Sequence, residues 1–421
     1  MSFAIVRQAH RNLFAMRGQI YAPPGRAQQG GRDLRLDLFR GLALLFIFID
    51  HVPDNVLSYF TLQSFSFCDA AEVFIFISGF AAATVYGKAF QRRGSIVATA
   101  QIYRRVWQLY VAHIFLFVLF AAVVCYATMS VGTENYSEDF GIDNFVEEPN
   151  LAIIKTLLLQ YQPQYLDILP LYVVLLGVFP LMLLLLERHL VLALAVSGTI
   201  YLLTLYFGWH PKSYPDNDAW FFNPLAWQFL FVIGAAGGYA PYSRQALPRV
   251  GAWLPKLAVG ITIALAVVHV TWVIHASYEA FPALLSDHLT PFADDKANLA
   301  PLRLLSFLAL AVTVTYFVQR NNRLLDTAIA RLIIRCGQHS LQVFCVGVLL
   351  AVIAQILLTA VRDDIAMQLA ISIGGIVLML AVASLLAWYK ADNAMPSDKA
   401  AAGVANPVRP PPVAGALQQA A

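Results

Sequence analysis

The chain is poor in charged residues, and this shortage is its first informative property. Among its 421 residues, 13% are Asp, Glu, Lys or Arg, whereas 59% are hydrophobic. Soluble domains carry roughly 25% charged residues. The composition therefore excludes an ordinary soluble globular protein and predicts a protein that crosses a membrane several times.

Other absences narrow the class further. The apolar runs are continuous rather than alternating with polar residues, which excludes the strands of a membrane barrel and predicts an all-α fold. The net charge of +3 does not indicate a nucleic-acid partner, because the surplus follows from membrane topology. We find no His, Cys and Asp spacing typical of a metal site. The four cysteines show no paired spacing, which favours free core residues over a single disulfide between Cys68 and Cys125.

About ten apolar runs are each long enough to form a transmembrane helix. They cover residues 36–52, 70–88, 105–128, 168–187, 190–207, 223–240, 256–276, 301–318, 338–360 and 367–388. With both termini in the cytoplasm, all but five of the 28 lysines and arginines fall in cytoplasmic loops or helix ends. This bias predicts a polytopic integral membrane protein with both termini cytoplasmic.

The chain divides into one large membrane domain and two flanking segments. Residues 1–31 form a basic cytoplasmic segment, for which a surface helix on anionic lipid and simple disorder are both open. Residues 32–390 contain the predicted membrane domain. Residues 391–421 are rich in Ala and Pro, which predicts a disordered cytoplasmic tail.

Arg40 and His51 lie at opposite ends of the first predicted membrane helix. Eleven helical steps bring the second residue to within roughly 20° of the same face, after about 16 Å of rise. A fixed cation and a titratable base therefore share one face, half a bilayer apart. Ionisable groups inside membranes are costly and are usually functional.

Carboxylates surround His51 in the sequence at the outer end of the first two helices. Glu72 opens the second helix, and a histidine beside a carboxylate is typical of a general base with an orienting partner. Asp50 orients a neighbouring group or caps the helix. For Asp54 and Asp69, also at these ends, we favour helix capping and solvation over catalysis.

Arg104 and Arg105 open the third membrane helix at the cytoplasmic edge. Together with Arg40 they would hold phosphate groups through bidentate hydrogen bonds. Anchoring by snorkelling side chains is the alternative for the arginine pair. An ion pair between Asp37 and Arg40 is a structural alternative for Arg40.

Two further features remain open between structure and function. His113 lies near mid-membrane in the third helix, where a buried neutral histidine and a functional one are equally expected. The outer loop at 208–222 combines aromatic rings with carboxylates, a composition that suits a sugar-binding surface. An interfacial aromatic belt is the favoured interpretation of that loop.

The motifs around these residues resemble the acyltransferase-3 superfamily of membrane proteins, and within it the OpgC family. The resemblance rests on Arg40 and His51 with ten residues between them, on Glu72 before Phe-Ile-Phe-Ile-Ser-Gly-Phe, and on the arginine pair of the third helix. Four further stretches support it. They are the blocks at 32–41, 49–51, 169–172 and 337–345.

The resemblance implies an enzyme of the bacterial inner membrane that moves an acyl group from cytoplasmic acyl-CoA to a periplasmic glucan. It implies a succinyl group and no permanently bound cofactor. His51 would be the catalytic residue, and Arg40, Arg104 and Arg105 would hold the coenzyme A end. An acetyltransferase acting on another envelope polysaccharide and a transporter or flippase are the competing functions, although we see no inverted repeat.

Overall fold

The computed structural model describes residues 33–131, 135–215, 219–243, 251–277 and 290–392. This part of the chain is built from helices and isolated bridges, without a β-strand, so the all-α prediction is confirmed. The basic segment at 1–31 and almost all of the predicted tail lie outside the described residues. The four cysteines are free, as predicted.

Each apolar run of the sequence corresponds to one helix. The ten helices are α2 (Leu34–Asp50), α3 (Ala70–Arg93), α4 (Ser95–Val131), α8 (Ile168–Arg188), α9 (Leu190–Phe207), α10 (Pro224–Tyr239), α11 (Leu254–Ser277), α13 (Pro301–Phe317), α15 (Ser340–Ala360) and α16 (Ile365–Asp392).

Seven of these helices are long and apolar enough to cross a membrane, namely α3, α4, α8, α9, α11, α15 and α16. The others are shorter, with 17 residues in α2, 16 in α10 and 17 in α13. A helix of this length rises about 25 Å, slightly less than a hydrocarbon core of about 30 Å. The sequence count of about ten membrane crossings stays a prediction for these three.

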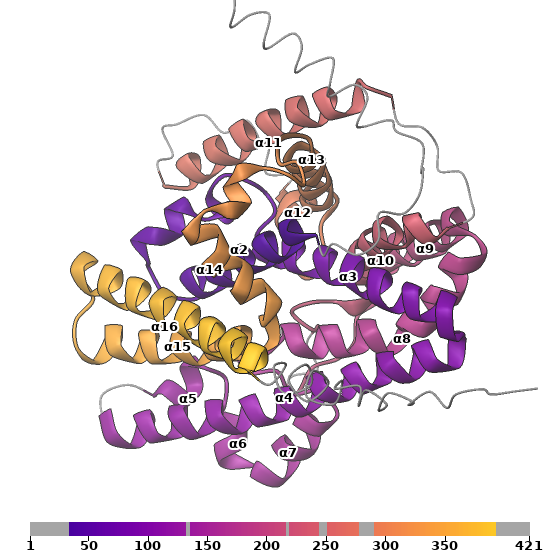
Figure 1. Ribbon diagram of the computed structural model, residues 1–421. Coiled ribbons are helices and arrows are strands. Elements are labelled where there is room, and N and C mark those ends of the chain that lie inside the picture. Colours follow the sequence, from indigo (N-terminus) through magenta and orange to yellow (C-terminus); the bar gives the residue numbers. More distant parts are fainter. Residues whose placement is uncertain (1–32, 132–134, 216–218, 244–250, 278–289, 393–421) are drawn as a thin grey trace, which may run out of the picture.

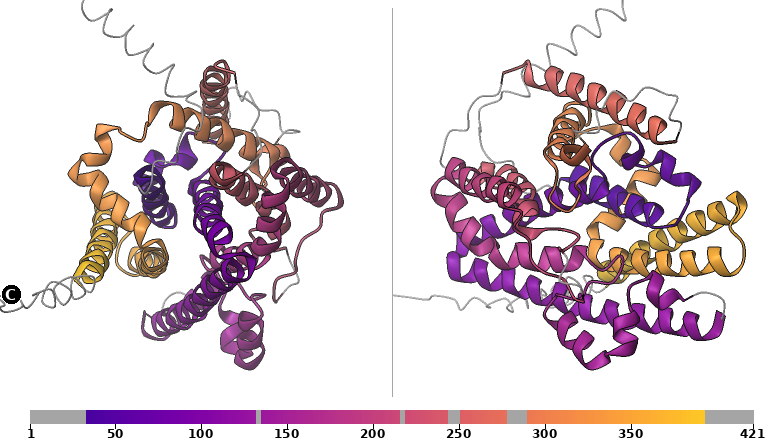
Figure 2. Two further views of the ribbon diagram at one scale, coloured as in Figure 1. Left: turned by 45° about the vertical axis from the view of Figure 1, so that its right-hand side comes forward. Right: turned by 180° about the vertical axis from the view of Figure 1, so that it is seen from behind.

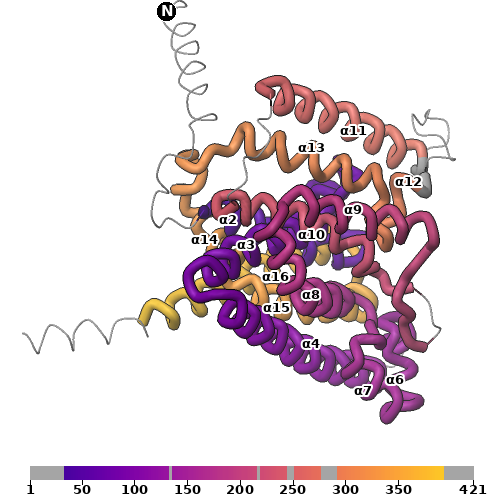
Figure 3. Tube along the Cα trace, turned by 90° about the vertical axis from the view of Figure 1, so that its right-hand side faces the viewer, coloured from indigo at the N-terminus to yellow at the C-terminus, as the bar shows by residue number. Residues whose placement is uncertain are grey.

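Short helices lie between the long ones in the chain. Figure 3 shows α6 (Asp143–Glu147), α7 (Pro149–Leu157) and α12 (Thr290–Asp294) at the end of the bundle opposite to the C-terminal end of α16. The remaining short elements are α5 (Tyr136–Asp139), α14 (Ala328–Gln338), η1 (Val56–Phe60), η2 (Leu62–Ser64), η3 (Ala240–Tyr242) and η5 (Arg323–Asp326).

Helices α2 and α3 lie in the middle of the bundle, between α11 on one side and α4 on the other (Figure 1). The turned views of Figure 2 show the same arrangement. α2 packs against α14, α3 and α15, while α3 packs most extensively against α10. The helix that carries Arg40 and His51 is therefore surrounded by other helices.

Glycines allow two of these helix pairs to approach closely. At the crossing of α2 and α14, a Cβ on Gly41 would collide with the backbone of Ile333, and one on Gly337 with the backbone of Asp37. Gly79 of α3 meets the backbone of α10 in the same way. Small residues at helix contacts are typical of membrane proteins. These contacts fix α2 and α3 relative to their neighbours.

The two ends of α2 are set by local chemistry. Asp33 caps the beginning, where its side chain accepts a hydrogen bond from the backbone N–H of Arg35 at 3.2 Å. At the other end, Pro53 has no N–H to continue the helix. Asn55 then donates from its side chain to the carbonyl of Ile49 at 3.1 Å. The helix therefore ends beside His51, where the chain turns.

Candidate active site

His51 occupies the position at which α2 ends. Its N–H donates to the carbonyl of Ile47 at 3.1 Å, so it continues the helical hydrogen bonding by one step. The rings of His51 and Tyr165 have their centres 4.4 Å apart. The Tyr165 hydroxyl also donates to the backbone carbonyl of His51 at 3.1 Å. One neighbouring side chain thus holds both the ring and the backbone of the histidine.

A cavity of about 330 Å³ opens beside His51, and we call it the outer cavity. Charged and polar residues of its wall include Asp50, Asp69, Asp167 and Lys296. Nδ1 of His51 and one carboxylate oxygen of Asp50 are buried without a hydrogen-bond partner among the described residues. Because most buried polar atoms in proteins have partners, two such atoms here indicate a site for a polar molecule.

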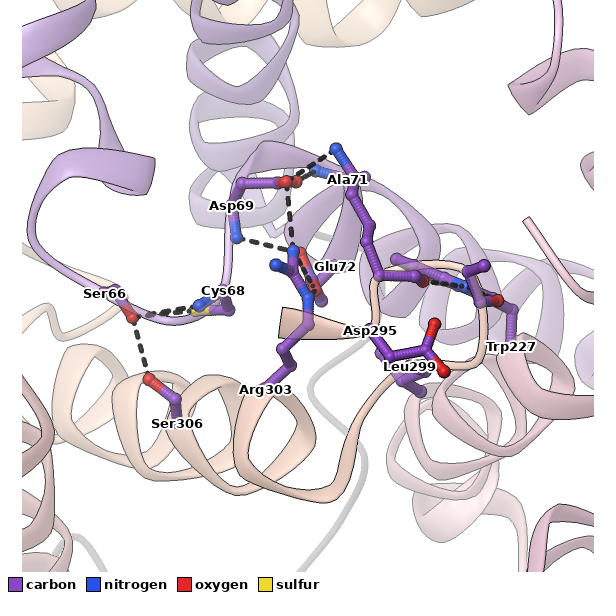
Figure 4. A network of polar contacts seen from close by, with 12 residues as sticks. Ser66, Cys68, Asp69, Ala71, Glu72, Trp227, Asp295, Leu299, Arg303 and Ser306 are labelled. Atoms are coloured by element: carbon purple, nitrogen blue, oxygen red, sulfur yellow. Dashed lines mark hydrogen bonds and ion pairs between the residues drawn. The ribbon is translucent and has the colours of Figure 1, made fainter. Parts of the chain in front are cut away.

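Asp69 connects this cavity to a network of ion pairs (Figure 4). Its carboxylate caps α3 by accepting from the N–H of Ala71 at 2.7 Å. Lys296 lies 2.7 Å and Arg303 lies 3.1 Å from the same carboxylate. Burial opposes ionisation of Asp69, but the two cations hold its pKa below the usual range. Burial likewise opposes ionisation of Lys296. The charge of Asp69 more than offsets this effect, so the pKa of Lys296 is raised.

Glu72, which the sequence placed beside His51, lies in this network rather than in the cavity wall. One of its carboxylate oxygens accepts from Nε of Arg303 at 2.8 Å. The other accepts from the backbone N–H of Asp69 at 2.8 Å and completes a capping box. Both oxygens are therefore occupied away from the histidine, and Glu72 supports the wall from behind.

Asp167 lies on the loop immediately before α8 and contributes a third carboxylate to the outer cavity. Burial raises the pKa of Asp167 to about 6, and the nearby charge of Lys296 limits the rise. The group therefore changes between its neutral and ionised forms close to neutral pH.

A second cavity of about 120 Å³ lies nearer the beginning of α2, and we call it the inner cavity. Arg40 of α2 and Arg105 of α4 both contribute to its wall, together with hydroxyl groups of Ser78, Tyr86, Tyr172 and Ser340. Arg40 also donates from Nη2 to the carbonyl of Ile77 at 3.1 Å. Two guanidinium groups with several hydroxyls suit a phosphate-bearing ligand. Arg104, by contrast, is exposed and does not line this cavity.

One layer of aromatic side chains separates the two cavities. Phe344 lines the outer cavity, whereas Phe74 and Tyr172 line the inner one. The rings of Phe74 and Phe344 stack with centres 6.4 Å apart, and Tyr172 meets Phe74 edge-on at 6.4 Å. The two cavities thus follow one another along α2 and α3, from His51 to the arginines.

Comparison with known proteins assigns this architecture to a family. The family model described as OpgC protein matches residues 32–391, which is most of the chain and all of the helical domain. The chain belongs to the OpgC family. OpgC membership and the apolar helices make it a transmembrane protein of an acyltransferase family. Neither a curated protein nor a solved structure matches the chain.

The two remaining candidate residues lie outside both cavities of this OpgC protein. His113 is fully buried in α4, and neither ring nitrogen has a hydrogen-bond partner among the described residues. Asp37 is buried at the crossing of α2 and α14. Neither of them lines a cavity with His51 or Arg40. In the described residues we find no group of three or more His, Cys, Asp or Glu side chains placed to hold a metal ion.

Sequence reasoning missed several residues of the outer cavity in this OpgC chain. Tyr165, Asp167 and Lys296 all come from loops distant in sequence from α2. A usable signal existed, because Asp167 immediately precedes an apolar run and Lys296 shortly precedes another, both on the predicted outer side. Tyr165 also has a left-handed backbone with φ of 68°, which is uncommon outside glycine and occurs often at functional sites.

Proposed function

We propose that this OpgC protein transfers a succinyl group from cytoplasmic acyl-CoA to a hydroxyl group of a periplasmic glucan. The observation that carries the proposal is the arrangement along α2. A histidine with an unpartnered ring nitrogen lies in the outer cavity, and two arginines line the inner cavity. One helix thus connects a candidate base with a candidate phosphate site.

The distribution of basic residues indicates which cavity faces which side of the membrane. All but five lysines and arginines lie on loops and helix ends of the side predicted to be cytoplasmic. Arg40 and Arg105 are on that side of His51. In a bacterial inner membrane, the inner cavity would then face the compartment that contains acyl-CoA, and the outer cavity would face the periplasmic glucan.

Binding of the donor would use Arg40 and Arg105 against the phosphates of coenzyme A. The pantetheine arm would extend toward His51, over the roughly 16 Å that separates the two ends of the pair on α2. Stacked rings of Phe74 and Phe344 lie on this route. They would have to rotate apart to admit the thioester, and when closed they separate the two cavities.

In the direct mechanism, His51 acts as a general base. The imidazole takes the proton of a glucan hydroxyl, whose oxygen attacks the thioester carbonyl and forms the new ester bond. The C–S bond breaks, and the departing coenzyme A thiolate takes the proton back from His51. Tyr165 would fix the position of the ring during both proton transfers through its contacts with His51.

A covalent mechanism uses the same residues in two steps. The neutral imidazole attacks the thioester carbonyl and becomes acylated, the C–S bond breaks, and coenzyme A leaves as the thiol with the proton of the ring. The oxygen of the glucan hydroxyl then attacks the acyl group and forms the ester, and the proton of the hydroxyl returns to the imidazole. Incubation with labelled acyl-CoA in the absence of glucan distinguishes the two routes. Label on His51 requires the covalent route, whereas a rate that depends on simultaneous binding of both substrates requires the direct one.

The proposal predicts that His51→Ala abolishes acylation of periplasmic glucans while the protein still inserts and folds. The expected loss is at least 10²-fold, the usual contribution of a positioned general base. Mass spectrometry of glucans from deletion strains complemented with wild type or variant measures it and identifies the acyl group by its mass.

His210→Ala is the matched control, because His210 is an exposed histidine on the same side and does not line the outer cavity. We expect normal ester content in that strain, and equal amounts of both variants in the membrane fraction. Normal ester content in the His51→Ala strain would refute the proposed function.

A further inference from the structure

An exposed aromatic ring lies at the rim of the outer cavity. Phe221 lines the cavity, yet 52% of the residue is open to solvent. Its neighbour Phe222 also lines the cavity and is buried. The two rings meet edge-on with centres 4.9 Å apart. Nζ of Lys296 lies over the Phe221 ring, 5.5 Å from its centre, and the exposed part of the ring leaves apolar surface beside the polar cavity.

The segment that carries this ring is firmly held. Phe222 packs edge-on against Trp227 at 4.8 Å. Asn223 donates from its side chain to the carbonyl of Trp209 at 2.6 Å and to the side chain of Asn298 at 2.8 Å. Nε1 of Trp227 donates to the carbonyl of Lys296 at 3.1 Å. The ring is therefore positioned before any ligand arrives, which reduces the entropy lost on binding.

The charges of the cavity disfavour an anionic ligand. Its described wall contains the carboxyl groups of Asp50, Asp69 and Asp167 and one ammonium group, that of Lys296, which already lies within 2.7 Å of Asp69. A ligand carboxylate or phosphate would therefore find no free cation in this described part of the wall. Hydroxyl groups, in contrast, can donate to carboxylate oxygens and accept from the glutamine amides that also line the wall.

From these observations we propose that Phe221 and the outer cavity form an acceptor subsite for one neutral pyranose unit of a glycan. The ring stacks against the C–H face of the sugar, because the face of an aromatic ring carries negative charge density. The carboxylate of Asp167 accepts hydrogen bonds from its hydroxyls. The inference rests on the proposed function, to which it adds the residue that binds one sugar unit of the acceptor.

The size of the cavity supports a single sugar unit. A volume of about 330 Å³ is at the lower end of the roughly 300–1,000 Å³ typical of small-molecule sites. A longer glycan must leave its other units outside. Phe221 lies where the chain would emerge, half exposed and half in the cavity wall.

An aromatic belt at the membrane interface makes a different prediction for the same loop. Trp209 is 49% exposed and stacks on Phe207 at 5.2 Å, but it does not line the cavity. If Phe221 serves only the interface, replacement of Trp209 and of Phe221 should have equal effects. If Phe221 binds sugar, only its own replacement should weaken acceptor binding.

The test uses the full-length protein in detergent and in proteoliposomes. Binding of a neutral gluco-oligosaccharide is measured by calorimetry, next to the same oligosaccharide oxidised to carboxylates at C6. Initial transfer rates are measured over a range of acceptor concentrations. The variants are Phe221→Ala, Phe221→Trp and the control Trp209→Ala.

We expect Phe221→Ala to raise the Kd and the KM for the neutral acceptor about tenfold, with kcat and the donor KM unchanged. Phe221→Trp and Trp209→Ala should bind like wild type, and the oxidised acceptor should bind much more weakly. Equal effects of Phe221→Ala and Trp209→Ala, or equal affinity for the two acceptors, would overturn the subsite.

Failure of the proposed function has a different signature. In that case wild type transfers no acyl group to any glucan. The binding measurement still shows whether the outer cavity and Phe221 bind a sugar unit. Binding of the neutral oligosaccharide that depends on Phe221 would keep the subsite without acyl transfer. Absence of any binding would remove it.

Discussion

The outer cavity brings together several groups that can gain or lose a proton. His51, Asp50, Asp69, Asp167 and Lys296 all line it. Among these, Asp69 and Lys296 stabilise each other's charged forms at 2.7 Å. Burial raises the pKa of Asp167 to about 6, and the nearby charge of Lys296 limits this rise. At the level of single residues, Asp167 is therefore a group that responds to pH near neutrality.

We predict that the KM for the acceptor falls as pH rises through about 6, because ionised Asp167 accepts hydrogen bonds that the neutral acid accepts less well. The folded-state pKa lies above the usual 3.8, so the carboxylate form is present above about pH 6 and is lost below it. Asp167→Asn should remove this step from the pH profile. A step that persists in Asp167→Asn would show that another group of the cavity causes it.

Helical spacing was sufficient to predict the depth of single residues but not their partners. Arg40 and His51 lie near the two cavities because both are fixed by position along one helix. Glu72 was expected beside His51 and instead pairs with Arg303, which is 231 residues further along the chain. Such a partner depends on how α13 packs, and a single sequence contains no measure of that packing.

At the level of helices, close crossings decide where α2 lies. Gly337 of α14 meets the backbone of Asp37, and Gly41 of α2 meets the backbone of Ile333. Any side chain at these positions must separate the two helices. Arg40 directly precedes Gly41, so a displaced α2 would also move the arginine of the inner cavity.

Gly337→Ala should therefore destabilise the protein by about 1–3 kcal/mol, the usual effect of overpacking a tight contact. The measurement is the thermal stability of detergent-solubilised protein. Gly374→Ala is the matched control, because a Cβ at Gly374 of α16 meets nothing within 4 Å. Equal stability of both variants would contradict the packing described for α2 and α14.

The long helices were predictable because each one coincides with a long apolar run. α14 was not predicted. Its 11 residues are too few to cross a membrane, they include Arg331 and Arg335, and they fall almost entirely in a segment assigned to a cytoplasmic loop. The sequence could not identify α14 and α10 as the helices that approach Gly41 and Gly79.

For the whole molecule, two cavities and one intervening aromatic layer define the proposed path of the acyl group. The outer cavity ends at Phe344, and the inner cavity begins at Phe74 and reaches Val85. The eleven helical steps from Phe74 to Val85 on α3 correspond to about 16 Å of helix. Donor and acceptor would thus approach His51 from opposite faces of the membrane and would meet only at the layer formed by Phe74 and Phe344.

The most direct test of this account is a sided transfer assay in sealed vesicles. Inverted vesicles contain a neutral gluco-oligosaccharide in the lumen and receive labelled succinyl-CoA from outside; right-side-out vesicles receive both substrates from outside only. We predict acylated oligosaccharide inside the inverted vesicles, none in the right-side-out preparation, and none with His51→Ala. Transfer of equal extent in both orientations, or transfer that survives His51→Ala, would contradict an acyl path across the membrane that ends at His51.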